Sequence, residues 1–247
     1  MPVRSSATPS ESPNPISTPG LTWLASMLQT TDPLFPIGSY AHSYGLEELC
    51  ASGEVKDAAT LLKFLESVVF LNLQEFELPY LRFSYIAAER NDFEDICQLD
   101  EEINASKPCK ELRQASSSQG QQRLRLIYKL RPTDRFEALH ELKKQKRIIP
   151  HHITIFAAEN VDLGTPLDAT LMSWTYQALA APCAASLKLV RIGQEGAQTV
   201  LTKSLRQVAT LIQRSQSIDR EFAGAFLPNL DVASQRHEHA YARLFIS

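Results

Sequence analysis

The 247-residue sequence is poor in glycine and lacks the cysteine spacings that bind metal. Glycine occurs nine times, and the four cysteines are Cys50, Cys97, Cys109 and Cys183. Because no C-x-x-C pair occurs, neither a zinc ribbon nor a thioredoxin-type site is supported. In a chain long enough to bury its own core, scattered cysteines are expected to be buried, reduced thiols.

The motifs of nucleotide binding and nucleophilic catalysis are also missing. The sequence has no G-x-x-x-x-G-K-[ST] phosphate loop, no G-x-G-x-x-G turn and no G-x-S-x-G nucleophile elbow. We therefore predict no catalytic residue, no metal ligand and no directly bound cofactor.

Charge and hydropathy argue against two further classes of protein. The net charge of −3 and the pI near 6.1 are untypical of nucleic-acid binders, which carry a basic footprint. No apolar run reaches the ~18 residues of a membrane span, and the N-terminus lacks the apolar stretch of a secretory signal. A cytoplasmic location is expected.

Long stretches free of turn signals, with apolar residues at helical spacing, dominate the sequence. We predict an all-α, bundle-like single domain of about ten helices over residues 21–218. Residues 1–20 hold five prolines among serines and threonines, so a disordered tail is expected there. Residues 219–247 lose the helical period and are expected to form a separate C-terminal segment.

The densest run of conformationally demanding residues lies at positions 32–48. Two prolines and Gly38 fix the turn, and Ser39 is predicted to cap a helix that begins at Tyr40. On that helix Tyr40, Tyr44 and Glu47 would share one side. Tyrosines beside a carboxylate suit a protein interface, although a half-buried helix after a turn has the same pattern.

Several other positions carry local predictions. Asp57 is expected to cap a long helix, and Pro79 to start the next one. The acidic run at positions 100–102 is expected on a solvated face. Gly120 lies inside a helical pattern, which indicates a close backbone contact.

Two groups of residues resemble the signatures of one known family, the urease accessory protein F (UreF) family. At the N-terminus they are Phe35-Pro36-Ile37-Gly38-Ser39-Tyr40, His42-Ser43 and Gly45-Leu46-Glu47. At the C-terminus they are Phe226-Leu227-Pro228, Leu230-Asp231-Val232-Ala233-Ser234, His237-Glu238 and Arg243-Leu244-Phe245-Ile246-Ser247. A looser similarity covers most of the chain between them.

The resemblance implies an all-helical, dimeric protein that acts as a non-enzymatic maturation factor. In that role it would bridge accessory protein D (or H) and the GTPase accessory protein G for GTP-dependent nickel insertion into apo-urease. The expected partners are therefore proteins D (or H) and G, apo-urease and a second copy of the chain. Nickel and GTP would be carried by the partners.

Candidate site residues combine interface chemistry with the two signatures. The predicted partner contacts are Tyr40, His42, Tyr44, Glu47, His237, Glu238, Tyr241, Arg243 and Phe245. Tyr40 and Tyr176 are assigned to the homodimer, and Arg243 to holding the C-terminal tail. The residue pattern alone favours docking of the apolar C-terminus on its own domain. The resemblance instead implies that residues 219–247 are a partner-binding segment that becomes ordered on a partner.

Two alternatives remain open at the level of sequence. His237 and His239, at i and i+2 on an extended segment, could bind a metal together with His151 or His152, which would make the chain a nickel carrier or a metal-dependent enzyme. Against this, the adjacent histidines at positions 151 and 152 are expected on the surface or behind the ligands. A generic helical scaffold with no link to urease is the second alternative.

Overall fold

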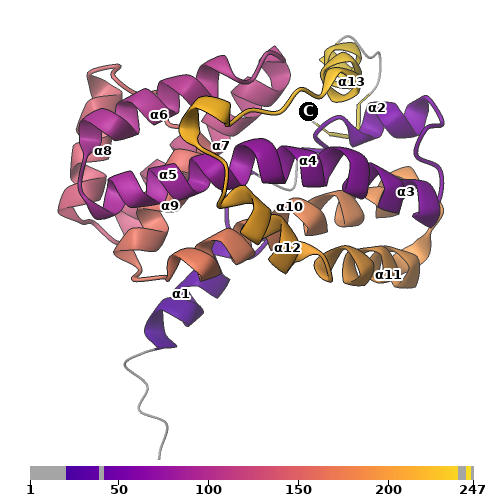
Figure 1. Ribbon diagram of the computed structural model, residues 1–247, viewed down its shortest axis with the longest axis horizontal. Helices are drawn as coiled ribbons and strands as arrows, with labels where there is room; N and C mark the ends of the chain where they lie inside the picture. Colours follow the sequence, from indigo (N-terminus) through magenta and orange to yellow (C-terminus); the bar gives the residue numbers. More distant parts are fainter. Residues whose placement is uncertain (1–20, 39–41, 239–242, 246–247) are drawn as a thin grey trace, which may run out of the picture.

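The computed structural model describes residues 21–38, 42–238 and 243–245, and these residues form helices without any strand (Figure 1). The predicted all-α fold is confirmed. The elements are α1 (Thr22–Thr31), α2 (Leu46–Ala51), α3 (Ala58–Phe64), η3 (Leu65–Val69), α4 (Phe70–Asn72), η4 (Leu73–Glu77), α5 (Leu78–Glu89), α6 (Phe93–Ala105), α7 (Lys110–Leu130), α8 (Asp134–Lys144), α9 (His152–Asp162), α10 (Leu167–Leu189), α11 (Gly193–Leu205), α12 (Val208–Ser215), η5 (Arg220–Phe222) and α13 (Pro228–Glu238).

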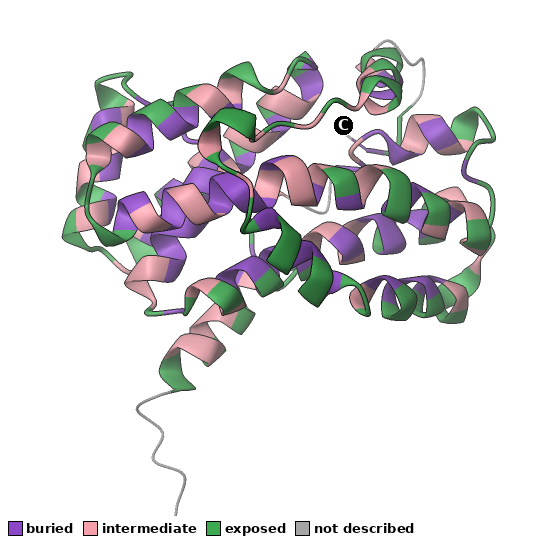
Figure 2. Cartoon of the chain, viewed as in Figure 1, coloured by how far each residue is buried: buried purple, intermediate pink, exposed green. Residues whose placement is uncertain are grey.

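The core is built around α9, which packs against both α5 and α7. Eight of its eleven residues are buried, so it is apolar on nearly every side. In Figure 2 the buried colour is concentrated where α5 and α9 meet. None of the described helices is both long and apolar enough to cross a membrane.

One uninterrupted helical run extends from α3 to α5, with the π-helical segments η3 and η4 inside it. Asp57 caps its start as predicted, because its carboxylate accepts the backbone N–H of Thr60 at 2.8 Å. The prediction of a new helix at Pro79 is wrong. The wider π turn of η4 just before this proline lets the helix continue without the usual clash.

Pro79 cannot donate to the carbonyl of Glu75 four residues earlier, because its nitrogen carries no hydrogen. That carbonyl instead accepts the backbone N–H of Gly224 at 2.7 Å. Gly224 belongs to the segment that crosses the long helical run on its way from α12 to α13 (Figure 1). The freed carbonyl therefore helps to fix the path of the chain toward α13.

The acidic run in α6 was predicted to be a solvated face, and this prediction is wrong. Two of its three carboxylates bind groups of the protein. Asp100 is buried and accepts the backbone N–H groups of Ile149 and His151 at 2.8 and 2.9 Å. Burial raises the pKa of the Asp100 carboxyl to about 7. Glu102 binds the guanidinium of Arg220 at 2.8 Å. Only Glu101 is exposed as expected.

Two features of the later helices are not evident from the sequence. Helix α10 runs through Pro182 as one 23-residue element, although a proline inside a helix usually kinks or breaks it. The apolar residues from Gln198 to Ile212 keep a helical spacing, but the stretch is divided between α11 and α12. The turn between them lies at Arg206 and Gln207, a pair with no glycine or proline to signal it.

Gly120 provides the closest backbone approach in the core, which confirms the contact predicted there. A Cβ atom at this position in α7 would lie 2.0 Å from the carbonyl oxygen of Pro150 and 2.6 Å from the carbonyl carbon of His151. Both atoms belong to the backbone that leads into α9. The pairing of α7 with α9 therefore depends on the absence of a side chain.

Replacing Gly120 by alanine is expected to destabilise the protein by about 2 to 3 kcal/mol, because backbone atoms must move to admit the methyl group. Urea unfolding followed by circular dichroism measures this change. Gly196→Ala in α11 is the matched control. Its new methyl would meet only the Cβ of Ile192 at 3.4 Å, and alanine favours a helix by up to about 1 kcal/mol. Equal stability of the two variants would contradict the close-contact interpretation.

Candidate functional site

The glycine-rich turn before α2 differs from the prediction. Tyr44 and Gly45 have positive φ angles of 52° and 82°, and the helix begins only at Leu46. Tyr44 and Glu47 therefore do not share the face of one helix. The left-handed conformation of Tyr44 and Gly45 ends the turn and sets the direction in which α2 begins. Tyr40 and the proposed cap Ser39 lie outside the described residues.

Gly45 also allows the C-terminal helix to lie close to the start of α2. A Cβ atom on Gly45 would lie 2.9 Å from the Cδ1 atom of Leu230 and 3.1 Å from the Oγ atom of Ser234. Both residues belong to α13, which packs against α2 and α7 (Figure 1). The two signature regions, about 190 residues apart in sequence, therefore meet in space.

Four charged side chains join the ends of the chain, and we call them the C-terminal cluster: Glu47, Glu111, His237 and Arg243. His237 lies between the two carboxylates, with Nε2 3.0 Å from Glu47 and Nδ1 3.0 Å from Glu111. Arg243 donates to the other oxygen of Glu111 at 2.9 Å. The His237 side chain is only 1% exposed, so these contacts are shielded from solvent.

The same cluster holds the backbone of residues 243–245. The carboxylate of Glu47 accepts the N–H of Leu244 at 2.7 Å and that of Phe245 at 3.0 Å. The Phe245 ring is 6% exposed, and the ammonium of Lys188 on α10 lies 5.6 Å from its centre. Residues 243–245 are thus held in place both by the buried Phe245 ring and by hydrogen bonds to the charged Glu47 carboxylate.

Electrostatics keep the Glu47 carboxylate ionised. Burial on its own would raise the pKa of this group, but hydrogen bonds from the Leu244 N–H, the His237 ring and the Phe245 N–H outweigh it. The pKa of Glu47 is consequently lowered. An ionised Glu47 is the form that can accept all three hydrogen bonds at once.

The other two N-terminal candidates face inward. His42 is 8% exposed, its ring lies 5.9 Å from the Tyr44 ring, and burial lowers its pKa. The Tyr44 hydroxyl exchanges hydrogen bonds with the Gln119 amide on α7, and burial raises the pKa of Tyr44 to about 12. In this structure the pair anchors the turn to α7.

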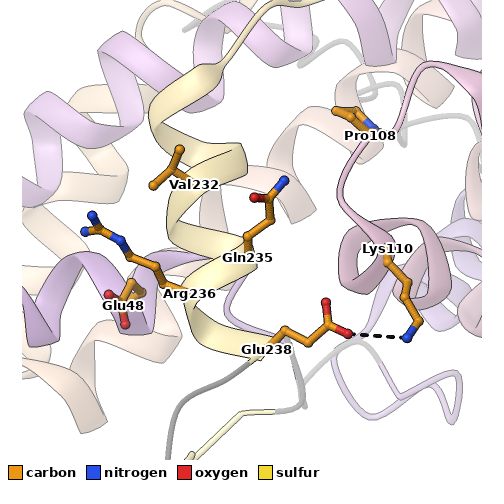
Figure 3. Close-up of a pocket in the computed structure, with 7 residues that line it drawn as sticks. All are labelled: Glu48, Pro108, Lys110, Val232, Gln235, Arg236 and Glu238. Carbon is orange, nitrogen blue, oxygen red and sulfur yellow. Dashed lines mark hydrogen bonds and ion pairs between the residues drawn. The ribbon is translucent and has the colours of Figure 1, made fainter.

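A groove runs beside the cluster, between α13, α2 and the start of α7 (Figure 3). Its volume is about 720 Å³, and its lining residues are Glu48, Pro108, Lys110, Val232, Gln235, Arg236 and Glu238. Glu238 pairs with Lys110 across the groove at 3.3 Å. Both charges remain exposed, so this ion pair contributes little stability and is free to exchange for other contacts.

The geometry assumed for a histidine metal site is wrong. His237 lies on α13, and not on an extended segment, with both ring nitrogens facing carboxylates. His151 is fully buried, within 3.0 Å of Ser116 and 3.3 Å of Asn104, and so is not on the surface. Within the described ranges no three His, Cys, Asp or Glu side chains are arranged to hold a metal ion. His239 lies outside those ranges.

The remaining homodimer candidate lies on a different surface. Tyr176 on α10 is 46% exposed, as are Met172 at 45% and Leu187 at 44%. Met172 and Tyr176 are four residues apart and form a short apolar strip on one side of α10. Leu187 is separated from them by Leu179 and Cys183, which are buried on that side. No hydrogen bond or ion pair among the described residues links Tyr176 to the C-terminal cluster. Tyr241 lies outside the described residues.

Reasoning from the sequence missed two residues of the site. Glu111 holds both His237 and Arg243, and Gln119 holds Tyr44. Both belong to the polar segment that opens α7, where a solvated face and a buried polar face have the same pattern. The only signal was the unusual Gly120 next to Gln119, which indicated that this side of α7 is closely packed.

Comparison with known proteins finds one family, both by a family profile and among the most similar relatives. A family profile described as UreF matches residues 55–205. The urease accessory protein UreF of Marinomonas sp. (strain MWYL1) is 30% identical over 91% of this chain and 94% of its own length. The proteins of that name from Haemophilus influenzae (strain PittEE) and Actinobacillus pleuropneumoniae serotype 5b are 26% and 27% identical. They cover 92% and 91% of this chain, and 97% and 99% of their own lengths.

Replacing Glu47 by alanine is expected to release residues 243–245, because two backbone N–H groups lose their acceptor. Limited trypsin digestion after Arg243, followed by mass spectrometry, should then be at least about tenfold faster, for a loss of about 1.5 kcal/mol or more. Glu48→Ala, which removes the neighbouring carboxylate in the groove, is the control and should digest like the unmodified protein. Equal rates for both variants would mean that Glu47 does not hold the segment.

Proposed function

Since the chain belongs to the UreF family of urease accessory proteins, we propose that it acts in urease maturation as a non-enzymatic scaffold. It bridges accessory protein D (or H) and the GTPase accessory protein G while nickel is inserted into apo-urease. Nickel is cargo in this reaction, and GTP is bound and hydrolysed by protein G. The chain itself binds neither as a cofactor and works in the cytoplasm.

The observation that supports this proposal best is the meeting of the two signature regions. Glu47 comes from the first signature, and His237, which it contacts, comes from the second. Arg243 of the second signature joins them through Glu111, which also contacts His237. The outer side of this assembly is open to a partner, because Leu244 is 69% exposed and Val232 on α13 is 46% exposed. Exposed apolar groups beside charged ones are the usual composition of a protein interface.

We assign the contact with accessory protein D (or H) to this outer side. Arg243 and Glu238 are partly exposed there, whereas His237 and Phe245 are buried and hold the tail in place. Tyr241, which lies outside the described residues, is the fifth residue assigned to this contact. Glu238 lines the groove of Figure 3, where its exposed pair with Lys110 can be exchanged for a partner's charges. Glu47 binds the tail from α2, and Tyr44, beside the buried His42, fixes the turn before α2 to α7. Tyr40, which lies outside the described residues, is the fourth N-terminal residue assigned to this contact.

For the homodimer we propose the exposed strip of α10. Met172 and Tyr176 leave two exposed apolar side chains one turn apart on a helix that is otherwise largely buried, and Leu187 is exposed nearer its end. Tyrosine and methionine are enriched at interfaces, and the alanines of this helix allow a second chain to come close. Tyr176 would be its central contact, joined by Tyr40.

Removing residues 243–247 is expected to abolish binding to accessory protein D while the helical content stays unchanged. Of the described residues removed, only Phe245 is buried, so the core keeps nearly all of its contacts. Co-purification with proteins D and G, with and without a GTP analogue, measures binding, and circular dichroism measures the fold. Lys203→Ala, an exposed change on α11, is the control and should bind normally.

Three outcomes would contradict the proposal. Unfolding of the truncated chain would mean that the tail belongs to the core. If the gene is removed from a host that makes urease and urease activity does not change, the chain has no part in maturation, and a generic scaffold is the better description. Stoichiometric nickel retained by the purified chain in equilibrium dialysis would instead favour a carrier.

Replacing Tyr176 by glutamate is expected to weaken the homodimer by about 2 kcal/mol, or roughly thirtyfold, because a charge would enter an apolar interface. Sedimentation velocity over a concentration series measures the change. Leu71→Glu in α4 adds the same charge at a similarly exposed apolar position and is the control. A dimer of unchanged affinity in Tyr176→Glu would exclude this strip of α10.

A further inference from the structure

Helix α1 turns a row of apolar side chains to solvent. Helical spacing places Leu21, at its N-cap, on the same side as Leu24, Ala25 and Leu28, and we call these four residues the α1 stripe. Leu21 is 48% exposed and Leu28 is 59% exposed, Ala25 is exposed and Leu24 is half-buried. A surface helix of a globular protein normally turns such a stripe toward its core. In α1 the stripe is left open instead.

The other side of α1 fixes the helix to the rest of the chain. Thr30 is buried there, and Trp23 and Met27 are half-buried at the same helical spacing. Arg123 and Arg131 donate hydrogen bonds to the last turn of α1 at 2.9 and 2.7 Å, and α1 packs on α10. The helix is therefore held at its C-terminal end while its other end projects from the body of the protein (Figure 1). The α1 stripe is presented in a fixed direction.

The chemistry of α1 indicates what covers the stripe. None of its ten residues carries a charge. A helix that binds a membrane surface relies on a strongly charged face, which α1 lacks. A partner that is selected by its charge would find nothing to pair with on this helix. For a second copy of the chain the lack of charge is favourable, because a helix that packs on its own copy would otherwise bring like charges together.

The α1 stripe is also complementary to itself. When two antiparallel helices are related by a two-fold axis, residues at equal distances on either side of the axis face each other. An axis between Leu24 and Ala25 brings Leu21 opposite Leu28 of the second copy, and Leu24 opposite its Ala25. A large side chain then meets a small one at the centre, which lets the helices pack closely. The antiparallel direction is favoured because the helix dipoles of a parallel pair repel, and α1 has no charged residue to offset this.

We propose that α1 packs antiparallel on α1 of a second copy of this chain, through the α1 stripe. This pairing rests on the homodimer proposed above and adds a second contact to it. Two helices of ten residues are too small to hold a dimer alone, because stable interfaces bury about 1,200 to 2,000 Å². Since α1 packs on α10, the helix that carries the exposed Met172 and Tyr176, the two contacts can form one interface.

The first experiment determines the register of the pair by disulfide cross-linking of the full chain. Cys50, which is partly exposed, is replaced by serine in every variant, and the other three native cysteines are buried. In the proposed pair, two copies of Ala25→Cys place their thiols beside the axis, within the ~7 Å that a disulfide spans between Cα atoms. Two copies of Leu21→Cys, or two of Leu28→Cys, would be separated by about 10 Å along the helices. One copy of each would be directly opposite.

Cross-linking is started with a mild oxidant and followed by gel electrophoresis without reductant. We expect Ala25→Cys to cross-link at least about tenfold faster than Leu21→Cys or Leu28→Cys alone, because pairing raises the effective concentration of its thiols. An equilibrated mixture of Leu21→Cys and Leu28→Cys should also cross-link fast. Equal rates for Ala25→Cys and Leu21→Cys would overturn the proposal. If Leu21→Cys alone cross-links as fast as the mixture, the helices are parallel, and the proposal is likewise wrong.

The second experiment measures how much the stripe contributes to the dimer. Leu28→Glu places a charge in the proposed contact and should weaken the dimer by roughly tenfold in sedimentation velocity. Leu71→Glu on α4 is again the control and should leave the affinity unchanged, and circular dichroism should show the same helical content in both variants.

The two measurements separate this pairing from the homodimer on which it rests. A dimer that is lost in Tyr176→Glu but unchanged in Leu28→Glu would leave the homodimer in place and overturn the α1 pair, as it would if a different protein covers the stripe. An unmodified chain that is a monomer at every concentration would overturn both. A dimer weakened by Leu28→Glu, together with fast cross-linking of Ala25→Cys, would support the pair.

Discussion

Two carboxylates, Glu47 on α2 and Glu111 on α7, hold residues 243–245 against these two helices. Both are largely shielded from water, and a shielded charge must be paired or neutralised. His237 and Arg243 supply the pairing, and the N–H groups of residues 244 and 245 complete it. The position of α13 and of the C-terminal segment follows from satisfying these two groups, together with the burial of Phe245.

The need to pair a buried charge also applies in the interior of the protein. Arg123 on α7 is completely buried, pairs with Glu159 on α9 and donates to the carbonyl of Thr30 in α1. Its guanidinium lies about 5 Å from the ring centres of Phe35 and Phe156, an arrangement that favours a cation. Helix α1, which buries only Thr30, is joined to the rest of the chain by Arg123, by a hydrogen bond from Arg131 to Gln29 and by packing on α10. A buried pair of this kind adds little net stability, because removing two charges from water costs about as much free energy as their attraction returns. Removing one partner alone is strongly destabilising, because it leaves the other charge buried and unpaired.

Local chemistry was predictable wherever a residue acts on its own neighbourhood. The Asp57 cap needs only the N–H of Thr60, three residues later, and Gly120 shows a close contact by its unusual place in a helix. Predictions were wrong where a distant element decides. The helix continues through Pro79 because of a π turn whose spare carbonyl is satisfied by Gly224. Asp100 is buried because the start of α9 offers it two backbone N–H groups.

The sequence by itself determined the all-helical class, most of the helices and the family, since periodicity and short motifs are written locally along the chain. It also placed Glu47, His237 and Arg243 among the candidates. Only the tertiary structure decided that these three residues meet, that Glu111 joins them and that His42 and Tyr44 face inward. The reason is that a polar side chain looks the same in sequence whether water or a partner 190 residues away satisfies it.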